Sequence, residues 1–169
     1  VYLEKLVTKA RHVEVQVLGD THGKVVHLFE RDCSVQRRHQ KVVERAPAPY
    51  LSTEQQSAVC NAALRLAKHA GYIKFLQDSS TGEFYFIEVN PRIQVEHTVT
   101  EAVTGLDIVR AQILVAQGGH IGDESTGIPL QDKIELRGHA LQCRVTTEDP
   151  RNNFIPDYGH IVAYRSPSG

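Results

Sequence analysis

Glu-Phe-Tyr-Phe-Ile-Glu-Val-Asn-Pro-Arg-Ile-Gln-Val-Glu-His, residues 83–97, is the stretch around which the rest of this chain is organised. Its first half is rich in aromatic and β-branched residues, which favour a pleated and half-buried strand. Side chains alternate between the two faces of a strand, so Glu88 and Asn90 project from the same face near its end. Pro91 cannot donate a hydrogen bond to a sheet and is predicted to end the strand.

The end of this strand carries groups that suit phosphate chemistry. A carboxylate beside an amide oxygen, as in Glu88 and Asn90, suits a hard cation such as Mg²⁺, which shares its ligands with substrate phosphates. Arg92 can grip an anion with two hydrogen bonds, and Glu96 adds a second carboxylate. The pattern alone also fits an ion-pair loop at the edge of a sheet, because structural ion pairs cluster in the same way.

Length and composition narrow the class of protein. The 169 residues amount to one domain, and a net charge of -1 argues against a nucleic-acid partner. No apolar run approaches the ~20 residues of a membrane helix, so no membrane partner is expected. The three cysteines are odd in number and far apart, which predicts reduced thiols and a cytoplasmic protein. The lack of methionine and the final Ser-Pro-Ser-Gly predict a chain cut from a longer one.

A β-hairpin is predicted upstream of this stretch. Valines at positions 13, 15 and 17 alternate with polar residues, which is the period of a strand. Residues 19–23, Gly-Asp-Thr-His-Gly, supply a turn, and residues 24–30 return as the partner strand. His12 falls on the polar face, where a lone histidine is more often a solvated surface residue than a ligand.

The next segment, residues 31–41, is densely polar and reads Arg-Asp-Cys-Ser-Val-Gln-Arg-Arg-His-Gln-Lys. Such a run is commonly a solvated loop. Val42 and Val43 follow it as a predicted strand, so Gln36, His39 and Lys41 are expected to lead into a buried element. The ammonium of Lys41 suits a phosphate or carbonate oxygen.

The remaining elements complete an α+β pattern. A helix is predicted to begin after Ser52, which forms a capping box with Gln55. A hairpin is predicted from residues 72–77 and 83–90, helices at 98–104 and 106–116, and strands at 138–147 and 159–165. Arg144 in the penultimate strand indicates a cleft, or else an exposed strand face.

Three motifs resemble the biotin carboxylase domain of biotin-dependent carboxylases over nearly the whole chain. They are residues 30–41, Glu-Arg-Asp-Cys-Ser-Val-Gln-Arg-Arg-His-Gln-Lys, residues 86–97, and residues 142–150, Gln-Cys-Arg-Val-Thr-Thr-Glu-Asp-Pro. Within that family they are most similar to the pyruvate carboxylase branch, with the acyl-CoA carboxylases as the alternative. The resemblance implies an α+β fold. Residues 1–118 would be part of the C-terminal lobe of an ATP-grasp fold, and residues 119–169 the start of the biotin carboxylase C-terminal domain.

The resemblance also assigns roles to residues. The adenine pocket would be lined by Glu4, Lys5, Leu6 and Val7. The ribose and nearby groups of ATP would be held by His12, Gln36 and His39. The divalent metal, Mg²⁺ or Mn²⁺, would be bound by Glu88 and Asn90. The bicarbonate pocket would comprise Lys41, Arg92, Gln94 and Val95. The general base would be Glu96, and the residue facing the ureido group of biotin would be Arg144.

The implied reaction is ATP-dependent carboxylation of biotin by bicarbonate through carboxyphosphate, which is the chemistry of a ligase. Biotin would be carried on a domain absent from this chain, and the parent enzyme is expected to be a homo-oligomer, mitochondrial in a eukaryote. The N-terminal subdomain and the glycine-rich lid of the family would precede Val1, so the chain is expected to be inactive alone. The alternative is a non-catalytic folded fragment that makes only structural or dimer contacts. Another ATP-grasp ligase is a weaker alternative.

One segment departs from the family pattern. The family runs Gly-Tyr-x-x-Ala-Gly-Thr-x-Glu-Phe where this chain has Gly-Tyr-Ile-Lys-Phe at residues 71–75, so several residues are missing. Lys74 then stands in the place of a metal-binding glutamate. Hairpin geometry predicts that Lys74 lies close to Glu88, pairs with it and weakens metal binding.

Overall fold

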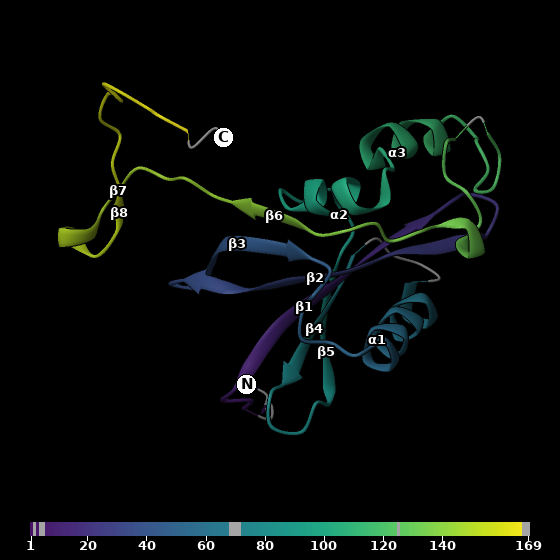
Figure 1. The fold of residues 1–169 in the computed structure, drawn as a ribbon, viewed down its shortest axis with the longest axis horizontal. Helices are drawn as coiled ribbons and strands as arrows, with labels where there is room; N and C mark the ends of the chain where they lie inside the picture. The colour runs from purple at the N-terminus through teal and green to yellow at the C-terminus, as the bar shows by residue number, and fades with distance from the viewer. Residues whose placement is uncertain (2, 4–5, 68–71, 125, 167–169) are drawn as a thin grey trace.

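The computed structural model describes residues 1, 3, 6–67, 72–124 and 126–166. Its centre is a six-stranded antiparallel sheet in the order β5-β4-β1-β2-β3-β6 (Figure 1). The strands are β1 (Ala10–Gly19), β2 (Val25–Arg37), β3 (Gln40–Ala46), β4 (Tyr72–Asp78), β5 (Phe84–Asn90) and β6 (Ala140–Cys143). The helices are α1 (Thr53–Leu66), α2 (His97–Thr104) and α3 (Ile108–Ala116), with short 3-10 turns at Gln131–Lys133 and Pro150–Asn152. This confirms the predicted α+β class.

Helices cover both faces of the sheet. Figure 1 shows α1 on one side and α2 and α3 on the other. Helix α1 begins at the predicted capping box of Ser52 and Gln55. It packs Val59 and Ala63 against valines of β1 and Phe75 of β4. A second core lies under α3, where Ile108 and Ala111 meet Leu28 of β2.

Burial on both faces corrects one expectation for β1. The predicted polar face of this strand is not solvated, because Glu14 and Gln16 are 0% and 1% exposed. The buried guanidinium of Arg31 in β2 lies on the same face and donates a hydrogen bond to Thr100 Oγ1 of α2 at 2.8 Å. Strand β1 therefore crosses the middle of the molecule, with an apolar core on one side and a buried polar layer on the other.

The polar run at residues 31–41 is also not a solvated loop. Strand β2 continues to Arg37 and turns through Arg38 and His39, which have positive φ angles of 51° and 63°, into β3. The β2 and β3 strands pair in antiparallel register, with Gln36 opposite Lys41. This hairpin carries Lys41 back over the centre of the sheet.

Residues beyond position 118 share the core of the residues before it. Ile121, Ile128 and Ile134 pack with Leu28 in one buried cluster, and β6 is the edge strand beside β3. The division into residues 1–118 and 119–169 stays a prediction. The described structure shows only that residues 119–143 complete the sheet and core of the first part.

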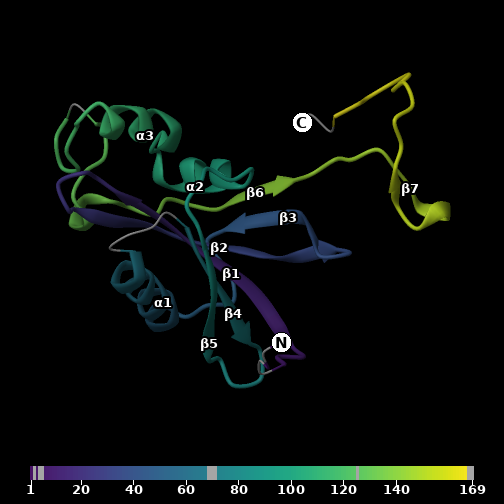
Figure 2. The ribbon, with the colours of Figure 1, turned by 180° about the vertical axis from the view of Figure 1, so that it is seen from behind.

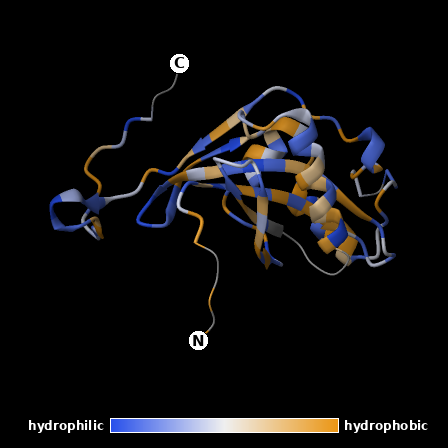
Figure 3. Cartoon of the chain, turned by 90° about the horizontal axis from the view of Figure 1, so that it is seen from below, coloured by the Kyte–Doolittle hydropathy of each residue, from blue (hydrophilic) through white to orange (hydrophobic). Residues whose placement is uncertain are grey.

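The end of the chain differs from the predicted strands. The strand expected at residues 138–147 is shorter, because β6 ends at Cys143. Residues 159–165, predicted as a strand, have no strand structure, since no described segment lies beside them to complete a hydrogen-bonded ladder. Two short strands, β7 (Glu148–Asp149) and β8 (Ile155–Pro156), pair with each other instead. Figures 2 and 3 show this segment extending away from the sheet and helices.

None of the described helices is long and apolar enough to cross a membrane. The three cysteines are free, Cys33 and Cys60 being buried and Cys143 exposed.

Candidate active site

The site begins with a row of charges across three neighbouring strands. Register places Lys74 of β4 directly opposite Glu14 of β1 on one side and Glu88 of β5 on the other. The Lys74 ammonium lies 2.7 Å from Glu88 Oε1 and 3.9 Å from Glu14 Oε1. Ile87 is an extra residue in β5, because Phe86 faces Phe75 while Glu88 faces Lys74. The predicted pairing of Lys74 with Glu88 is confirmed.

Lys41 links this row to the loop before α2. Its ammonium donates hydrogen bonds to the carboxylates of Glu14 and Glu96, which are 0% and 3% exposed. Glu96 occupies the N-cap position just before α2, yet its side chain does not cap the helix and accepts a hydrogen bond from Lys41 instead. Residues far apart in the sequence therefore meet, as the predicted roles of Lys41 and Glu96 require.

Arg144 approaches the same carboxylate from the other side. It lies one residue after β6, and its guanidinium is 2.9 Å from Glu96 Oε2 and 2.6 Å from Glu44 Oε1. The Arg144 side chain is 24% exposed, whereas Glu44 is fully buried. Arg144 therefore lies against two buried carboxylates and not on an exposed strand face, while its role toward biotin stays a prediction.

Buried residues that the sequence did not single out hold this arrangement together. Arg31 Nη1 donates to Gln16 Oε1 at 2.9 Å and to Thr100 Oγ1 at 2.8 Å, and Arg31 Nη2 lies 3.6 Å from Glu14. These bonds join β1, β2 and α2, so they fix the start of α2 relative to Lys41. The only signals in the sequence were charged residues at strand positions, Glu14 among the valines of β1 and Glu44 in β3.

The charges set the protonation of the site. Burial would raise the pKa of the Glu96 carboxyl, but the hydrogen bond and positive charge of Lys41 outweigh burial and hold it at about 2. The pKa of the Lys41 ammonium is raised above its ordinary value. Burial lowers this pKa, but nearby negative groups, including Glu14, raise it by more. Burial lowers the pKa of the His12 imidazole, which is therefore neutral at pH 7. Glu96 is thus an ionised carboxylate held between two cations.

The residues predicted to contact ATP fall into two groups. His12 and Gln36 come together, with Gln36 Nε2 2.8 Å from His12 Nδ1. His39 lies in the β2–β3 turn, where it lines a cavity of about 450 Å³ with Arg37, Gln40 and Phe154. Leu6 and Val7 precede β1 in irregular structure, and Leu6 is exposed. Glu4 and Lys5 lie outside the described residues.

The predicted bicarbonate residues are brought together only in part. Gln94 is buried, and in the amide orientation that satisfies both neighbours it donates to Glu14 Oε2 and Glu96 Oε1, each at 3.2 Å. Arg92 is exposed. Its guanidinium donates to the carbonyl of Ile93 at 3.3 Å, and its backbone N–H donates to the carbonyl of Asn90 at 2.9 Å. Among the described residues, no side-chain hydrogen bond joins it to Lys41 or Glu96. Val95 is 59% exposed. The roles of Arg92 and Val95 stay predictions.

The residues at the predicted metal position do not fit a divalent cation as they stand. Glu88 Oε1 accepts a hydrogen bond from Lys74 Nζ, and the amide nitrogen of Asn90 lies 3.4 Å from the same oxygen. Metal ligation needs free oxygen atoms and an excess of negative charge. Acidic and thiol groups of Glu14, Cys33 and Glu96 also approach within 4.8 Å of one another, but Lys41 bonds to both of these carboxylates.

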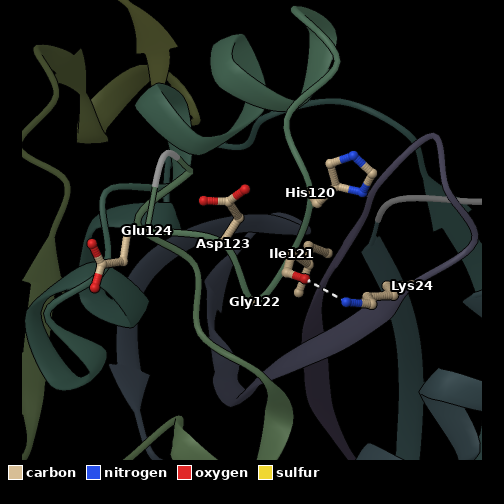
Figure 4. Close-up of a pocket in the computed structure, with 6 residues that line it drawn as sticks. All are labelled: Lys24, His120, Ile121, Gly122, Asp123 and Glu124. Atoms are coloured by element: carbon tan, nitrogen blue, oxygen red, sulfur yellow. Dashed lines mark hydrogen bonds between the residues drawn. The ribbon is translucent and has the colours of Figure 1, made fainter.

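A separate hollow lies at the far end of the β1–β2 hairpin (Figure 4). It has a volume of about 500 Å³ and is lined by Lys24 and residues 120–124. Lys24 Nζ donates to the carbonyl of Ile121 at 3.0 Å, as the dashed line in Figure 4 marks. None of the predicted site residues lines this hollow. It is therefore distinct from the charge cluster, the group of ion-paired residues around Glu14, Lys41 and Glu96.

The fold and the charge cluster agree with comparisons to known proteins. The chain belongs to the family described as carbamoyl-phosphate synthase L chain, ATP binding domain, whose model matches residues 1–124. Within that class it is similar to pyruvate carboxylase. It is 58% identical to the pyruvate carboxylase of Bacillus subtilis (strain 168) over 174 aligned positions, which cover 100% of this chain and 15% of that protein.

Solved structures give the same result. The complete multifunctional pyruvate carboxylase from Rhizobium etli matches with a TM-score of 0.94 and 66% identity, covering 100% of this chain and 17% of that one. The biotin carboxylase domain of Hydrogenobacter thermophilus 2-oxoglutarate carboxylase, solved with MgADP, ADP and bicarbonate, matches with a TM-score of 0.87 and 43% identity. That match covers 98% of this chain and 36% of the other. The chain thus spans about one sixth of the pyruvate carboxylases that it matches.

The alignments also bear on the shortened segment. The match to the B. subtilis protein has 174 positions, whereas this chain has 169 residues, so at least five positions have no counterpart here. The family pattern is five residues longer than residues 71–75 of this chain. The two differences are equal in size, so a shortening at residues 71–75 would account for all five positions.

Proposed function

We propose that this chain is part of a biotin carboxylase module, which uses ATP and bicarbonate to carboxylate biotin within a longer ligase of the pyruvate carboxylase type. One observation carries the proposal: Lys41, Glu96 and Arg144 come from three separate parts of the chain and meet as cation, carboxylate and cation. The similarity to biotin carboxylase domains supports the assignment of this cluster to bicarbonate and biotin.

The residues would act on bicarbonate as follows. Bicarbonate is an anion and a poor nucleophile, so it needs cations to hold it and a base to remove its proton. Lys41 and Arg92 would hold the anion, with Gln94 and Val95 at its edge, and the ionised Glu96 would accept its proton. Because Lys41 bonds to Glu96 in this structure, bicarbonate must take over part of that contact when it binds. Activated in this way, bicarbonate would attack the γ-phosphate of ATP, which breaks the bond to the β-phosphate, releases ADP and gives carboxyphosphate.

Arg144 would act on biotin. Carboxyphosphate would break down to CO₂ and phosphate, and the phosphate would accept the proton of the biotin ureido nitrogen, which then attacks CO₂. Loss of this proton places negative charge on the ureido oxygen, and a fixed guanidinium lowers the energy of that charge. Arg144 is held by the buried Glu44, so its position does not depend on biotin being bound. Biotin itself would arrive on a carrier domain in another part of the parent protein, which we propose to be a homo-oligomer.

ATP would lie over strands β1, β4 and β5, which carry the row of charges formed by Glu14, Lys74 and Glu88. His12 and Gln36, which are already in contact, and His39 are the proposed contacts to ribose and phosphate. Leu6 and Val7, together with Glu4 and Lys5, are proposed for adenine. Glu88 and Asn90 are the residues that the family resemblance assigns to Mg²⁺ or Mn²⁺. They do not fit a divalent ion in this chain, because Lys74 occupies the Glu88 carboxylate, so the mechanism has no step through a metal ion.

The test is bicarbonate-dependent ATP cleavage by the parent enzyme. Glu96→Gln keeps the shape of the side chain but removes the base, and Arg92→Ala removes an anion contact. Each is expected to lower the rate by roughly 10² or more, the scale of losing one electrostatic stabiliser or proton acceptor. The matched control is Glu135→Gln, which removes the carboxylate of an exposed pair with Arg137 and should leave the rate unchanged. Full activity in Glu96→Gln would refute the proposed role.

The rival proposal is a folded piece that performs no chemistry, and the pairing of Lys74 with Glu88 favours it. In that case the parent enzyme would lack bicarbonate-dependent ATP cleavage even without substitution. The isolated chain does not distinguish the two proposals by activity, because biotin-dependent ADP release is expected of neither. Robust release of ADP by the isolated chain would refute the non-catalytic proposal and the expectation that the chain is inactive alone.

A further inference from the structure

The charge cluster is balanced within itself. Its members form a connected row of ion pairs that runs from β5 across β4, β1, β2 and β3 to the residue after β6. The row contains four carboxylates and four cations, each in contact with a group of opposite sign: Glu14, Glu44, Glu88 and Glu96 with Arg31, Lys41, Lys74 and Arg144. His12 beside Glu14 is neutral at pH 7. The described cluster therefore has no surplus negative charge to attract a divalent ion.

Lys74 is the member that creates this balance at the metal position. The register of β4 fixes it between Glu88 and Glu14, and its side chain is only 15% exposed. Rotation away from Glu88 would leave the ammonium beside Glu14, still within the same cluster. A divalent cation approaching Glu88 must therefore displace Lys74 from the carboxylate and then bind beside a positive charge.

We propose that the Lys74 ammonium is the resident cation of this site, in place of a divalent ion at Glu88 and Asn90. In that role it supplies the positive charge that a nucleotide phosphate would meet. The proposal rests on the proposed function, since that function places the nucleotide phosphates over Glu88. It predicts that the chain binds divalent ions weakly and that its affinity for nucleotide changes little when such ions are added.

Mn²⁺ binding to the 169-residue chain, followed by electron paramagnetic resonance of the free ion, tests the first part. Lys74→Met removes the charge and keeps the apolar stem, and it is expected to bind Mn²⁺ roughly tenfold or more tightly than the unmodified chain, because one repulsive charge at ~4 Å is lost. Lys74→Arg keeps the charge and should bind as weakly as the unmodified chain. Combining Lys74→Met with Glu88→Gln should abolish the gain, which locates the ion at Glu88.

Equal Mn²⁺ affinity of the unmodified chain and Lys74→Met would overturn the proposal, whether both bind tightly or neither binds. A gain that persists with Glu88→Gln would overturn it as well. Circular dichroism establishes that each variant is folded, and Lys74→Gln replaces Lys74→Met if the latter is not.

Binding of a fluorescent ADP analogue, with and without Mn²⁺, tests the second part and separates the two proposals. Binding to the unmodified chain that is independent of Mn²⁺ supports the role of Lys74. Binding that strictly requires Mn²⁺ refutes it. If neither the unmodified chain nor Lys74→Met binds the analogue under any condition, the proposed nucleotide site is wrong. The claim that Lys74 supplies charge to phosphate then falls with it, and the Mn²⁺ comparison alone decides whether Lys74 excludes the ion.

Discussion

Replacing Lys41 by Met is the substitution that probes the cluster most directly. The ammonium of Lys41 is shared by Glu14 and Glu96, and both carboxylates are almost completely buried. Methionine fills nearly the same volume without charge, so the change removes the ion pair and little packing. After the change, Glu96 keeps Arg144 at 2.9 Å, and Glu14 keeps Arg31 at 3.6 Å.

The expected cost follows from these contacts. Removing one partner of a buried ion pair typically costs 3–5 kcal/mol, because the remaining charge stays buried without compensation. Each of the two carboxylates here keeps another cation after the change, so the lower end of this energy range applies. We expect the free energy of unfolding to fall by about 3 kcal/mol at pH 7.

The cost should also depend on pH. The pKa of Glu96 is about 2 in the folded chain, below its ordinary value of 4.5. A carboxyl with a lowered pKa contributes stability that is complete above the unfolded value and is lost as the pH falls through the folded value. The difference between the unmodified chain and Lys41→Met should therefore be largest above pH 4.5 and shrink as the pH falls toward 2.

Urea unfolding followed by circular dichroism at a series of pH values from 7 to 3 measures both effects. The control is Lys133→Met, which removes an exposed lysine without a described salt bridge and should change stability by less than about 0.5 kcal/mol. A loss below about 1 kcal/mol at pH 7, or a loss that does not shrink with acid, would show that the Lys41 pairs do not stabilise the fold as argued.

Three further predictions concern single contacts, and urea unfolding at pH 7 measures each. Thr100→Val removes the hydroxyl that accepts a hydrogen bond from the buried Arg31 and should cost about 1–3 kcal/mol, whereas a neutral effect would mean that this bond does not hold α2 in place. Arg144→Met leaves the buried Glu44 without its guanidinium and should cost about 3 kcal/mol, and unchanged stability would contradict the buried-pair geometry. Ser52→Ala removes the N-cap of α1 and should cost about 1 kcal/mol, and no loss would show that the capping box contributes nothing measurable.

Local patterns in the sequence determined much of this protein. The alternating valines of β1, the capping box at Ser52 and the aromatic run of β5 predicted their elements, because each pattern reflects a constraint within a few residues. The motif from Asn90 to His97 predicted the loop that carries Glu96, and the hairpin register predicted that Lys74 faces Glu88. These are short-range relations, and a single sequence records them directly.

The tertiary structure alone decided how the charges are shared. No local pattern indicated that Glu14 and Arg31 are buried, because the α2 helix that covers them lies some 70 to 85 residues further along the chain. It also could not show that Glu44, from β3, would hold Arg144, or that Arg92 would remain outside the cluster. Residues 159–165 have the composition of a strand but form none, because a strand needs a partner and the described chain supplies none there. Burial and pairing depend on which distant segments meet, and only the assembled sheet and its helices settle that.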